Sequence, residues 1–392
     1  MEDKIEIVIN EASGEKAQVF NLDEEMNRAF LIYIQKFFKN IAHSRIWNLE
    51  NYHNLETAIF EYFDRRYLVD NKDAFQKQDY LFNNLTFFSN YFLHNGWIAD
   101  AQKFLEKVLR TAMDWENSRK NRIHKGSIYY FWAELALFNN EIDKGFFLIH
   151  ESYREDCETY ETINPSTPSQ KTISLNTDKE NMLFDYVLRL SNFLMGKCQI
   201  YNKENNRNLS EKTIRELFLQ TPPSNDVLFS FTYALAKIEQ LESMQPYVKL
   251  SSFTGFYALN ILFNLVLVID NLRYSKIEKP NTRKDWEFSR LIKRLLVNSS
   301  FEINEEPINR NLKSVNDPLD IDFGKTINEL LDRTFIFECP TNVSPLYFDI
   351  ILCYAIRNYS AHNISLNETI ASRFKEISKG IFNTLFLAIE TH

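Results

Sequence analysis

The chain has 392 residues, enough for two or three domains with hydrophobic cores of ordinary size. Its formal net charge of −8 excludes a general attraction to nucleic acids or anionic membranes, so a nucleic-acid contact requires a local basic cluster. Only eight glycines accompany 33 phenylalanines and 19 tyrosines. This composition argues against glycine-rich phosphate loops and favours an all-α protein whose helices pack through aromatic side chains.

Cysteine usage and hydropathy indicate the compartment. Cys157, Cys198, Cys339 and Cys353 lack C-x-x-C spacing, so we interpret them as reduced thiols rather than disulfides or zinc ligands. The amino terminus lacks the pattern of a signal peptide. The most apolar run, residues 256–269, is shorter than the roughly 20 residues of a membrane span. We expect a cytoplasmic protein that does not contact a membrane.

Common motifs for bound groups are missing from the sequence. No G-x-x-x-x-G-K, G-x-S-x-G or G-x-G-x-x-G pattern occurs, and the histidines lack H-x-x-x-H spacing. We therefore predict neither a cofactor nor a bound metal.

The amino-terminal residues carry the one β-strand signal. Alternating apolar positions on either side of the turn-like sequence ASGEK predict a small hairpin over residues 4–21. We assign residues 1–22 to this arm. The pattern is helical from residue 23 onward, and helices are expected over about 55–68 and 77–94.

The helix expected over residues 77–94 begins a more specific pattern. Phe92, Gly96, Ala101 and Leu105 stand at offsets of four, five and four residues, and a weaker copy places Gly145 44 residues after Ala101. This spacing resembles a tetratricopeptide unit, in which small residues let two antiparallel helices cross closely. Tetratricopeptide-like helical hairpins are therefore expected within residues 23–249.

A polar stretch with two prolines, residues 161–180, predicts a surface loop without a core of its own. Helices follow over about 181–201, 210–219 and 225–242, the second of them starting at Ser210. Proline-containing breaks frame the last of these helices. We place a domain boundary near residue 250.

Residues 250–392 are expected to form a helical bundle. The apolar periodicity predicts helices over about 253–272, 286–297, 323–334, 346–358 and 367–391.

A basic segment lies inside this bundle. Residues 273–296 hold eight Lys or Arg against three acids. Such a cluster can bind an RNA backbone in an otherwise acidic protein. A solvated helix face that balances the acidic segment after it is the alternative. The candidate RNA-binding residues are Arg283, Lys284, Arg290, Lys293 and Arg294.

An arginine and a histidine follow the apolar helix that starts at Leu346. They form the sequence Arg357-Asn358-Tyr359-Ser360-Ala361-His362. A cation and an imidazole carried by one rigid element suit acid/base chemistry on a phosphate. The same spacing occurs at Arg119 and His124, but inside a polar connection, where we interpret the pair as structural.

With these residues in view, the carboxy-terminal third resembles the HEPN superfamily. Its signature is an Arg, a polar residue and a His after four to six intervening residues. The resemblance implies a metal-independent endoribonuclease whose composite site forms where two such domains dimerise. It also implies a role as a toxin or as an effector of defence against phage.

The same resemblance implies roles for individual residues. His362 would be the general acid/base for attack of the ribose 2′-hydroxyl on the adjacent phosphate, and Arg357 would neutralise the phosphate oxygens. Asn358 would orient its neighbours or bind the phosphate.

Helix geometry limits this arrangement. Five residues of an ideal helix turn by about 140°, so Arg357 and His362 share a face only if the helix ends or loosens between them. Ser360 and Asn363 favour such an end, and two copies that meet across a dimer axis would relax the constraint. Alternatively, Arg357 caps its helix and His362 is a turn histidine in a chain without nuclease activity.

A second reading of the whole chain is a non-enzymatic adaptor, in which the amino-terminal helical hairpins bind a protein or peptide partner on an aromatic-rich surface. Such a site would lie near Trp97, Trp115, Tyr129 and Trp132, although aromatic residues at helical spacing more often belong to the core.

Overall fold

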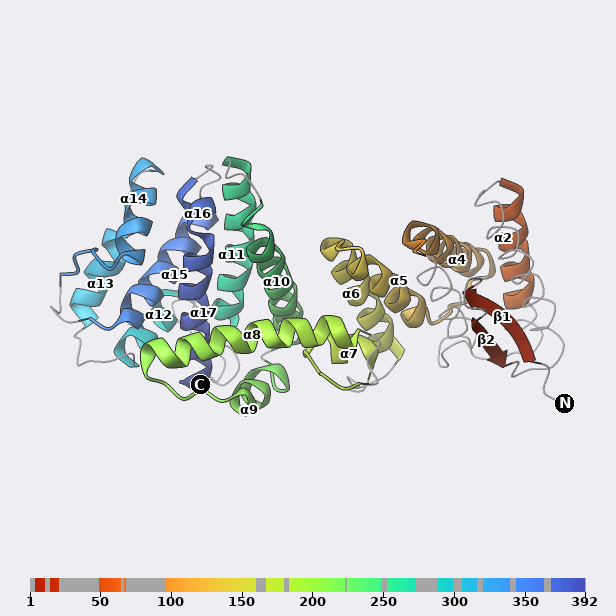
Figure 1. Cartoon of the computed structure of the whole chain (residues 1–392), viewed down its shortest axis with the longest axis horizontal. Helices are drawn as coiled ribbons and strands as arrows, with labels where there is room; N and C mark the ends of the chain where they lie inside the picture. The colour runs from red at the N-terminus through yellow and green to blue at the C-terminus, as the bar shows by residue number, and fades with distance from the viewer. Residues whose placement is uncertain are drawn as a thin grey trace. The chain divides into compact units, whose positions relative to one another are not determined.

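The computed structural model describes residues 4–10, 15–20, 49–64, 67, 96–159, 167–179, 183–222, 224–247, 252–272, 288–298, 305–315, 320–338, 343–362 and 368–391. Helices dominate these residues, which confirms the predicted all-α class (Figure 1). β1 (Lys4–Asn10) and β2 (Glu15–Phe20) pair antiparallel, with Ile5 opposite Val19. The helix expected over residues 77–94 lies outside the described residues.

The helices are, in chain order, α2 (Leu49–Phe63), α4 (Ile98–Arg119), α5 (Gly126–Phe138), α6 (Ile142–Thr159), α7 (Pro168–Ile173), α8 (Phe184–Asn205), α9 (Glu211–Ile214) with the π-helical turn η2 (Arg215–Leu219), α10 (Asn225–Met244), α11 (Ser252–Leu272), α12 (Phe288–Asn298), α13 (Glu305–Ser314), α14 (Asp320–Leu331), α15 (Pro345–His362), α16 (Glu368–Ser372) and α17 (Phe374–Glu390).

Packing divides the chain into two compact units, Met1–Lys171 and Thr172–His392, with the division inside α7. It does not coincide with the domain boundary expected near residue 250. The reason is that α8 packs on α17, and α10 packs on both α11 and α17. These contacts join two helices that we had placed in the amino-terminal domain to the carboxy-terminal bundle.

In the first unit, α5 and α6 pack against each other across the short connection 139–141. Gly145 allows this approach, because a Cβ atom at this position would lie 2.5 Å from Cδ2 of Leu137. A small residue at this crossing agrees with the expectation for position 145. The tetratricopeptide-like arrangement as a whole stays a prediction.

In the second unit, α17 is surrounded by α8, α11, α15 and α16, and most of its side chains are buried. Figure 1 shows α10, α11, α16 and α17 side by side, with α8 running across them. Helix starts follow local sequence rules. The Oγ atoms of Ser210 and Ser224 accept hydrogen bonds from the backbone N–H groups of Thr213 and Val227, as N-cap serines do.

Three expectations for the second half need correction. Within the stretch 161–180, the described residues 167–179 are not a loop without a core, since they contain α7 and bury Ile173 and Leu175 completely. The helix α13 was not expected, because its apolar positions are few. The predicted last helix is divided into α16 and α17 at Arg373.

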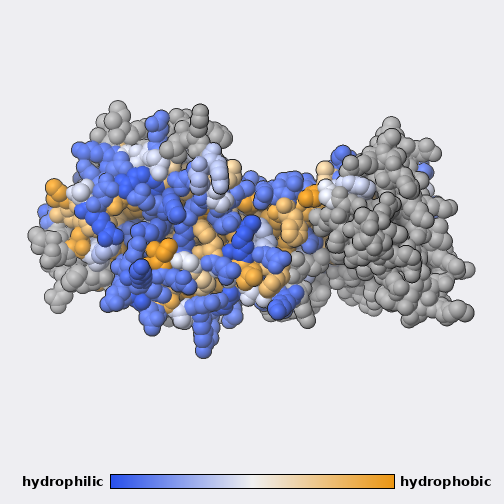
Figure 2. Space-filling view, viewed as in Figure 1, coloured by the Kyte–Doolittle hydropathy of each residue, from blue (hydrophilic) through white to orange (hydrophobic). Residues whose placement is uncertain are grey.

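The surface of the second unit is mostly hydrophilic on the face shown in Figure 2. Within α11, residues Thr254–Leu272 are long and apolar enough to cross a membrane by length and composition alone. However, 61% of this stretch is buried inside the protein. The core helix of a bundle passes the same test, so the stretch is weak evidence for a membrane span.

Candidate functional site

The helix α15 carries the candidate catalytic residues and is continuous to His362. The expectation that it ends between Arg357 and His362 was wrong. Ser360 donates its hydroxyl hydrogen to the carbonyl oxygen of Ile356 at 2.7 Å, a bond that the helix accommodates without ending. Positions 357 and 362 therefore lie about 140° apart around the helix axis. The side chain of His362 lies outside the described residues.

Arg357 occupies a partly open position at the end of the buried run of this helix. Its side chain is 32% exposed, while Ile350, Ile351 and Ile356 are completely buried. The Nε atom is buried and has no hydrogen-bond partner among the residues that the structure describes. The guanidinium is thus anchored inside the unit and reaches solvent only in part.

Three helices hold this guanidinium. Nη2 lies 3.8 Å from Oδ2 of Asp270 on α11, which is itself 7% exposed. Nη1 donates to Oδ1 of Asn358 at 3.3 Å. The ring of Phe288, the first residue of α12, lies 5.8 Å from the guanidinium carbon. Charge, hydrogen bond and ring together fix the position of Arg357.

Aromatic pairs make this neighbourhood rigid. The ring of Tyr354 stacks on Phe288 with centroids 6.2 Å apart, one helical turn before Arg357. The ring of Tyr359 stacks on Phe323 of α14 at 3.5 Å. Both pairs tie α15 to a neighbouring helix on either side of the arginine.

The basic helix α12 lies beside Arg357. It packs against α15 through a buried face that includes Leu291 and Leu295. Arg290 and Arg294 are exposed on its other side, and Lys293 is half-buried there. Phe288 links α12 to Arg357, whereas the exposed basic side chains lie on the opposite face of the helix. Arg283 and Lys284 lie outside the described residues.

The interior of α15 holds groups that sequence reasoning did not single out. Burial raises the pKa of Asp349, which accepts a hydrogen bond from Nδ2 of Asn383 at 2.7 Å. Burial, together with the carboxylates of Asp270 and Asp349, raises the pKa of the Cys353 thiol. Cys353 is completely buried, so its thiol belongs to the core.

Arg119 and His124 each contact an acidic side chain of the first unit. Nε and Nη2 of Arg119 donate to the two carboxylate oxygens of Asp64 at 2.7 and 2.6 Å. This hydrogen-bonded pairing lowers the pKa of Asp64. His124 is 5% exposed, with Nε2 3.4 Å from Oδ1 of Asp156. Both residues join segments of the first unit.

The aromatic surface proposed for a protein partner is partly core. Trp115 is completely buried, and Tyr129 is 7% exposed with a pKa that burial raises to about 12. Trp97 and Trp132 are half-buried. Trp132 donates to Gln102 at 3.3 Å and lies 5.0 Å below the ammonium of Lys144. Only two of the four residues retain surface for a partner.

The described part of the chain contains no group of three His, Cys, Asp or Glu side chains placed to hold a metal ion. Sequence reasoning missed Asp270 and Phe288 as parts of the site. For Asp270 a signal existed, because it is the one charged residue in the apolar sequence of α11, where an acid is costly unless paired. Phe288 carried no comparable signal.

The described residues form an all-α protein in which the guanidinium of Arg357 lies among α11, α12 and α15. No protein-family model, curated protein sequence or solved structure matches the chain.

Proposed function

We propose that the chain is a cytoplasmic, metal-independent endoribonuclease of HEPN type, with Arg357, Asn358 and His362 at a site that forms where two copies meet. The observation that supports it is the anchored, partly exposed guanidinium of Arg357, which lies 5.8 Å from the ring of Phe288 at the start of the basic helix α12. A cation fixed before the substrate arrives stabilises charge that develops on a phosphate without reorganisation.

The proposed reaction is a transesterification. His362 accepts the proton of a ribose 2′-hydroxyl, whose oxygen attacks the adjacent phosphorus. The bond from phosphorus to the 5′-oxygen breaks, and that oxygen takes up a proton. The products are a 2′,3′-cyclic phosphate and a 5′-hydroxyl. Arg357 neutralises the phosphoryl oxygens, and Asn358 holds Nη1 of Arg357.

The continuous helix favours a site shared between two copies. With positions 357 and 362 about 140° apart on one helix, the arginine of one copy and the histidine of the other can face the same phosphate. In this proposal the enzyme acts as a toxin or as an effector of phage defence. The first unit would then sense a trigger or hold the nuclease in check.

A cleavage assay in EDTA tests the activity. We expect the wild-type chain to cleave a mixed RNA in EDTA and to leave 2′,3′-cyclic phosphate ends, whereas Arg357→Ala and His362→Ala cleave it at least about 100-fold more slowly. EDTA inactivates contaminating nucleases that depend on metal ions. Arg333→Ala, which replaces an exposed arginine on the turn after α14, is the matched control. Equal cleavage by all four proteins, or none by the wild type, contradicts the proposal.

The salt dependence of RNA binding tests the role of α12. Each lost phosphate contact lowers the slope of log K against log salt by about 0.7 for a single strand, so Arg290→Gln, Lys293→Gln and Arg294→Gln together should lower it by about 2. Removing the same number of charges from α13 and α14, at Arg310, Lys313 and Lys325, should leave the slope nearly unchanged. Fluorescence anisotropy titrations at several salt concentrations measure both slopes, and equal slopes for the two triple variants would contradict the assignment.

The adaptor remains the second candidate because α5 and α6 expose two phenylalanines, Phe138 at 48% and Phe147 at 62%. Exposed aromatic side chains on one helical hairpin are frequent at protein interfaces. Absence of RNA cleavage under any condition would favour this function.

A further inference from the structure

We infer that Asp270 of α11 is a positioning residue, which aims the guanidinium of Arg357 at the scissile phosphate. This inference rests on the proposed ribonuclease function. The carboxylate lies 3.8 Å from Nη2 of Arg357 and is 7% exposed, so it holds the arginine from the protein side.

The charge of Asp270 is costly at its place in the fold. The other residues of α11 are uncharged, and its neighbours Val268 and Ile269 are almost fully buried. A buried carboxylate beside a cation contributes little net stability compared with an apolar residue of similar size. A role in placing Arg357 explains its presence better than a contribution to the stability of the bundle.

The surroundings leave the guanidinium little freedom once Asp270 is in place. The Phe288 ring lies 5.8 Å from the guanidinium carbon, and Asn358 accepts a hydrogen bond from Nη1. Asp270 adds a contact at Nη2. Three contacts from three helices define a position, whereas the two contacts that remain without Asp270 allow the side chain to swing toward solvent. Displacement of a catalytic group by about 1 Å can lower a rate by about 100-fold.

A variant that keeps the shape of the side chain but removes its charge isolates this role. Asp270→Asn is expected to lower kcat for RNA cleavage in EDTA by about 10-fold or more, with KM changed by less than about 3-fold, because RNA binding by α12 is intact. In an Arg357→Ala background, Asp270→Asn should lower the residual rate no further, because the residue acts only through Arg357.

Asp349→Asn is the matched control. This carboxylate is also on the bundle interior, two helical turns before Arg357 on α15, but it contacts Asn383 of α17 and not the arginine. Its replacement should leave kcat unchanged. Asp270→Glu, which keeps a carboxylate within reach, should recover kcat toward the wild-type value and provides the test if Asp270→Asn does not fold.

The outcomes separate this inference from the function on which it rests. No cleavage by the wild-type chain overturns both. Cleavage by the wild type with an equal kcat for Asp270→Asn overturns the positioning role alone. Three further results would also overturn the positioning role alone. They are a loss of kcat on adding Asp270→Asn to Arg357→Ala that equals the loss in the wild-type background, a similar loss of kcat in Asp349→Asn, and a kcat of Asp270→Glu as low as that of Asp270→Asn.

Discussion

Co-expressed Arg357→Ala and His362→Ala chains are expected to cleave RNA at about a quarter of the wild-type rate, although loss of the general acid/base alone lowers the rate by about 10²- to 10⁴-fold. Random pairing makes half of the dimers mixed. In each mixed dimer one of the two sites then combines an intact Arg357 from one copy with an intact His362 from the other. Initial rates per total protein, after purification of the co-expressed chains, measure this recovery.

The expectation follows from the continuity of α15. Positions 357 and 362 lie on different faces of one helix, which favours a site shared between two copies. A site within a single copy would leave the mixture inactive, because each chain lacks one of the two residues. Co-expression of the wild type with the double variant Arg357→Ala/His362→Ala is the matched control. It should give about a quarter of the wild-type rate for a shared site and about a half for a site within one copy. A mixture as inactive as its components would contradict the shared site.

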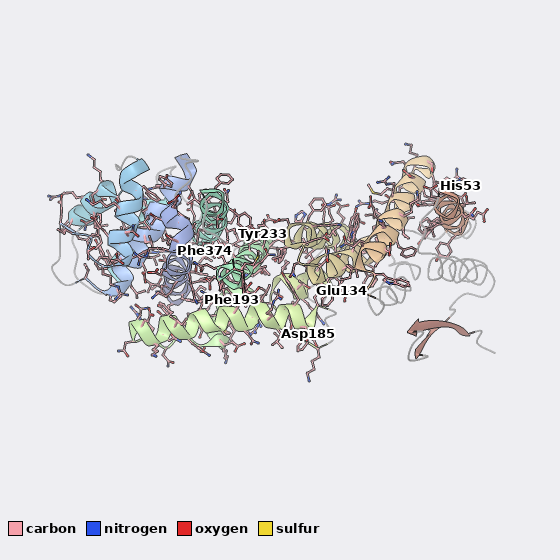
Figure 3. All side chains as sticks on the ribbon, turned by 45° about the horizontal axis from the view of Figure 1, so that its top comes forward. His53, Glu134, Asp185, Phe193, Tyr233 and Phe374 are labelled. Atoms are coloured by element: carbon pink, nitrogen blue, oxygen red, sulfur yellow. The ribbon has the colours of Figure 1, made fainter. Side chains whose placement is uncertain are left out.

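The second large effect concerns stability. Lys197 of α8 donates to both carboxylate oxygens of Glu242 on α10 at 2.7 and 2.8 Å, and Ser378 of α17 donates to the same carboxylate at 2.6 Å. The two charged side chains are 7% and 9% exposed. Burial lowers the pKa of Lys197, and Glu242 offsets this in part. Figure 3 marks Phe193 on α8 and Phe374 on α17 in this unit.

Lys197→Met should lower the free energy of unfolding by about 3–5 kcal/mol, because it leaves the carboxylate of Glu242 buried without a counter-ion. Adding Glu242→Gln removes that charge, keeps an acceptor for Ser378 and should restore most of the loss. Lys379→Met breaks a half-exposed pair with Glu204 and should cost less than about 1 kcal/mol. Urea denaturation of the four proteins measures these differences, and equal costs at Lys197 and Lys379 would contradict the argument.

Local signals in the sequence predicted the elements that carry the site. The apolar periodicity placed the core helices α11, α15 and α17, and the serine before α9 predicted its start because an N-cap depends on neighbouring residues alone. The exposed face of α12 also follows from the spacing of its basic residues.

Properties that depend on distant contacts were not predictable in this way. The end of α15 was misplaced because Ser360 and Asn363 read as helix-ending residues, whereas the packing of Tyr359 on Phe323 is a tertiary contact that supports one more turn. The pairing of Asp270 with Arg357 joins residues 87 positions apart, and only the fold shows it. The division of the chain at residue 172 was not predictable from composition, because proline-containing breaks mark loops whether or not a core continues across them.

The position of the boundary between the two units, at residue 172, determines where the chain can be truncated. A fragment that begins near residue 250 would separate Ser378 from Lys197 and Glu242 and uncover the sides of α11 and α17 that α8 and α10 occupy. Truncation at residue 172 keeps the ion pair and the aromatic contacts of Phe193 and Tyr201 with α17 in one piece. The smallest fragment that keeps Arg357 in its native surroundings therefore includes about 80 residues before the boundary expected near residue 250. Truncations within these residues that abolish function would report unfolding of the bundle rather than loss of a recognition module.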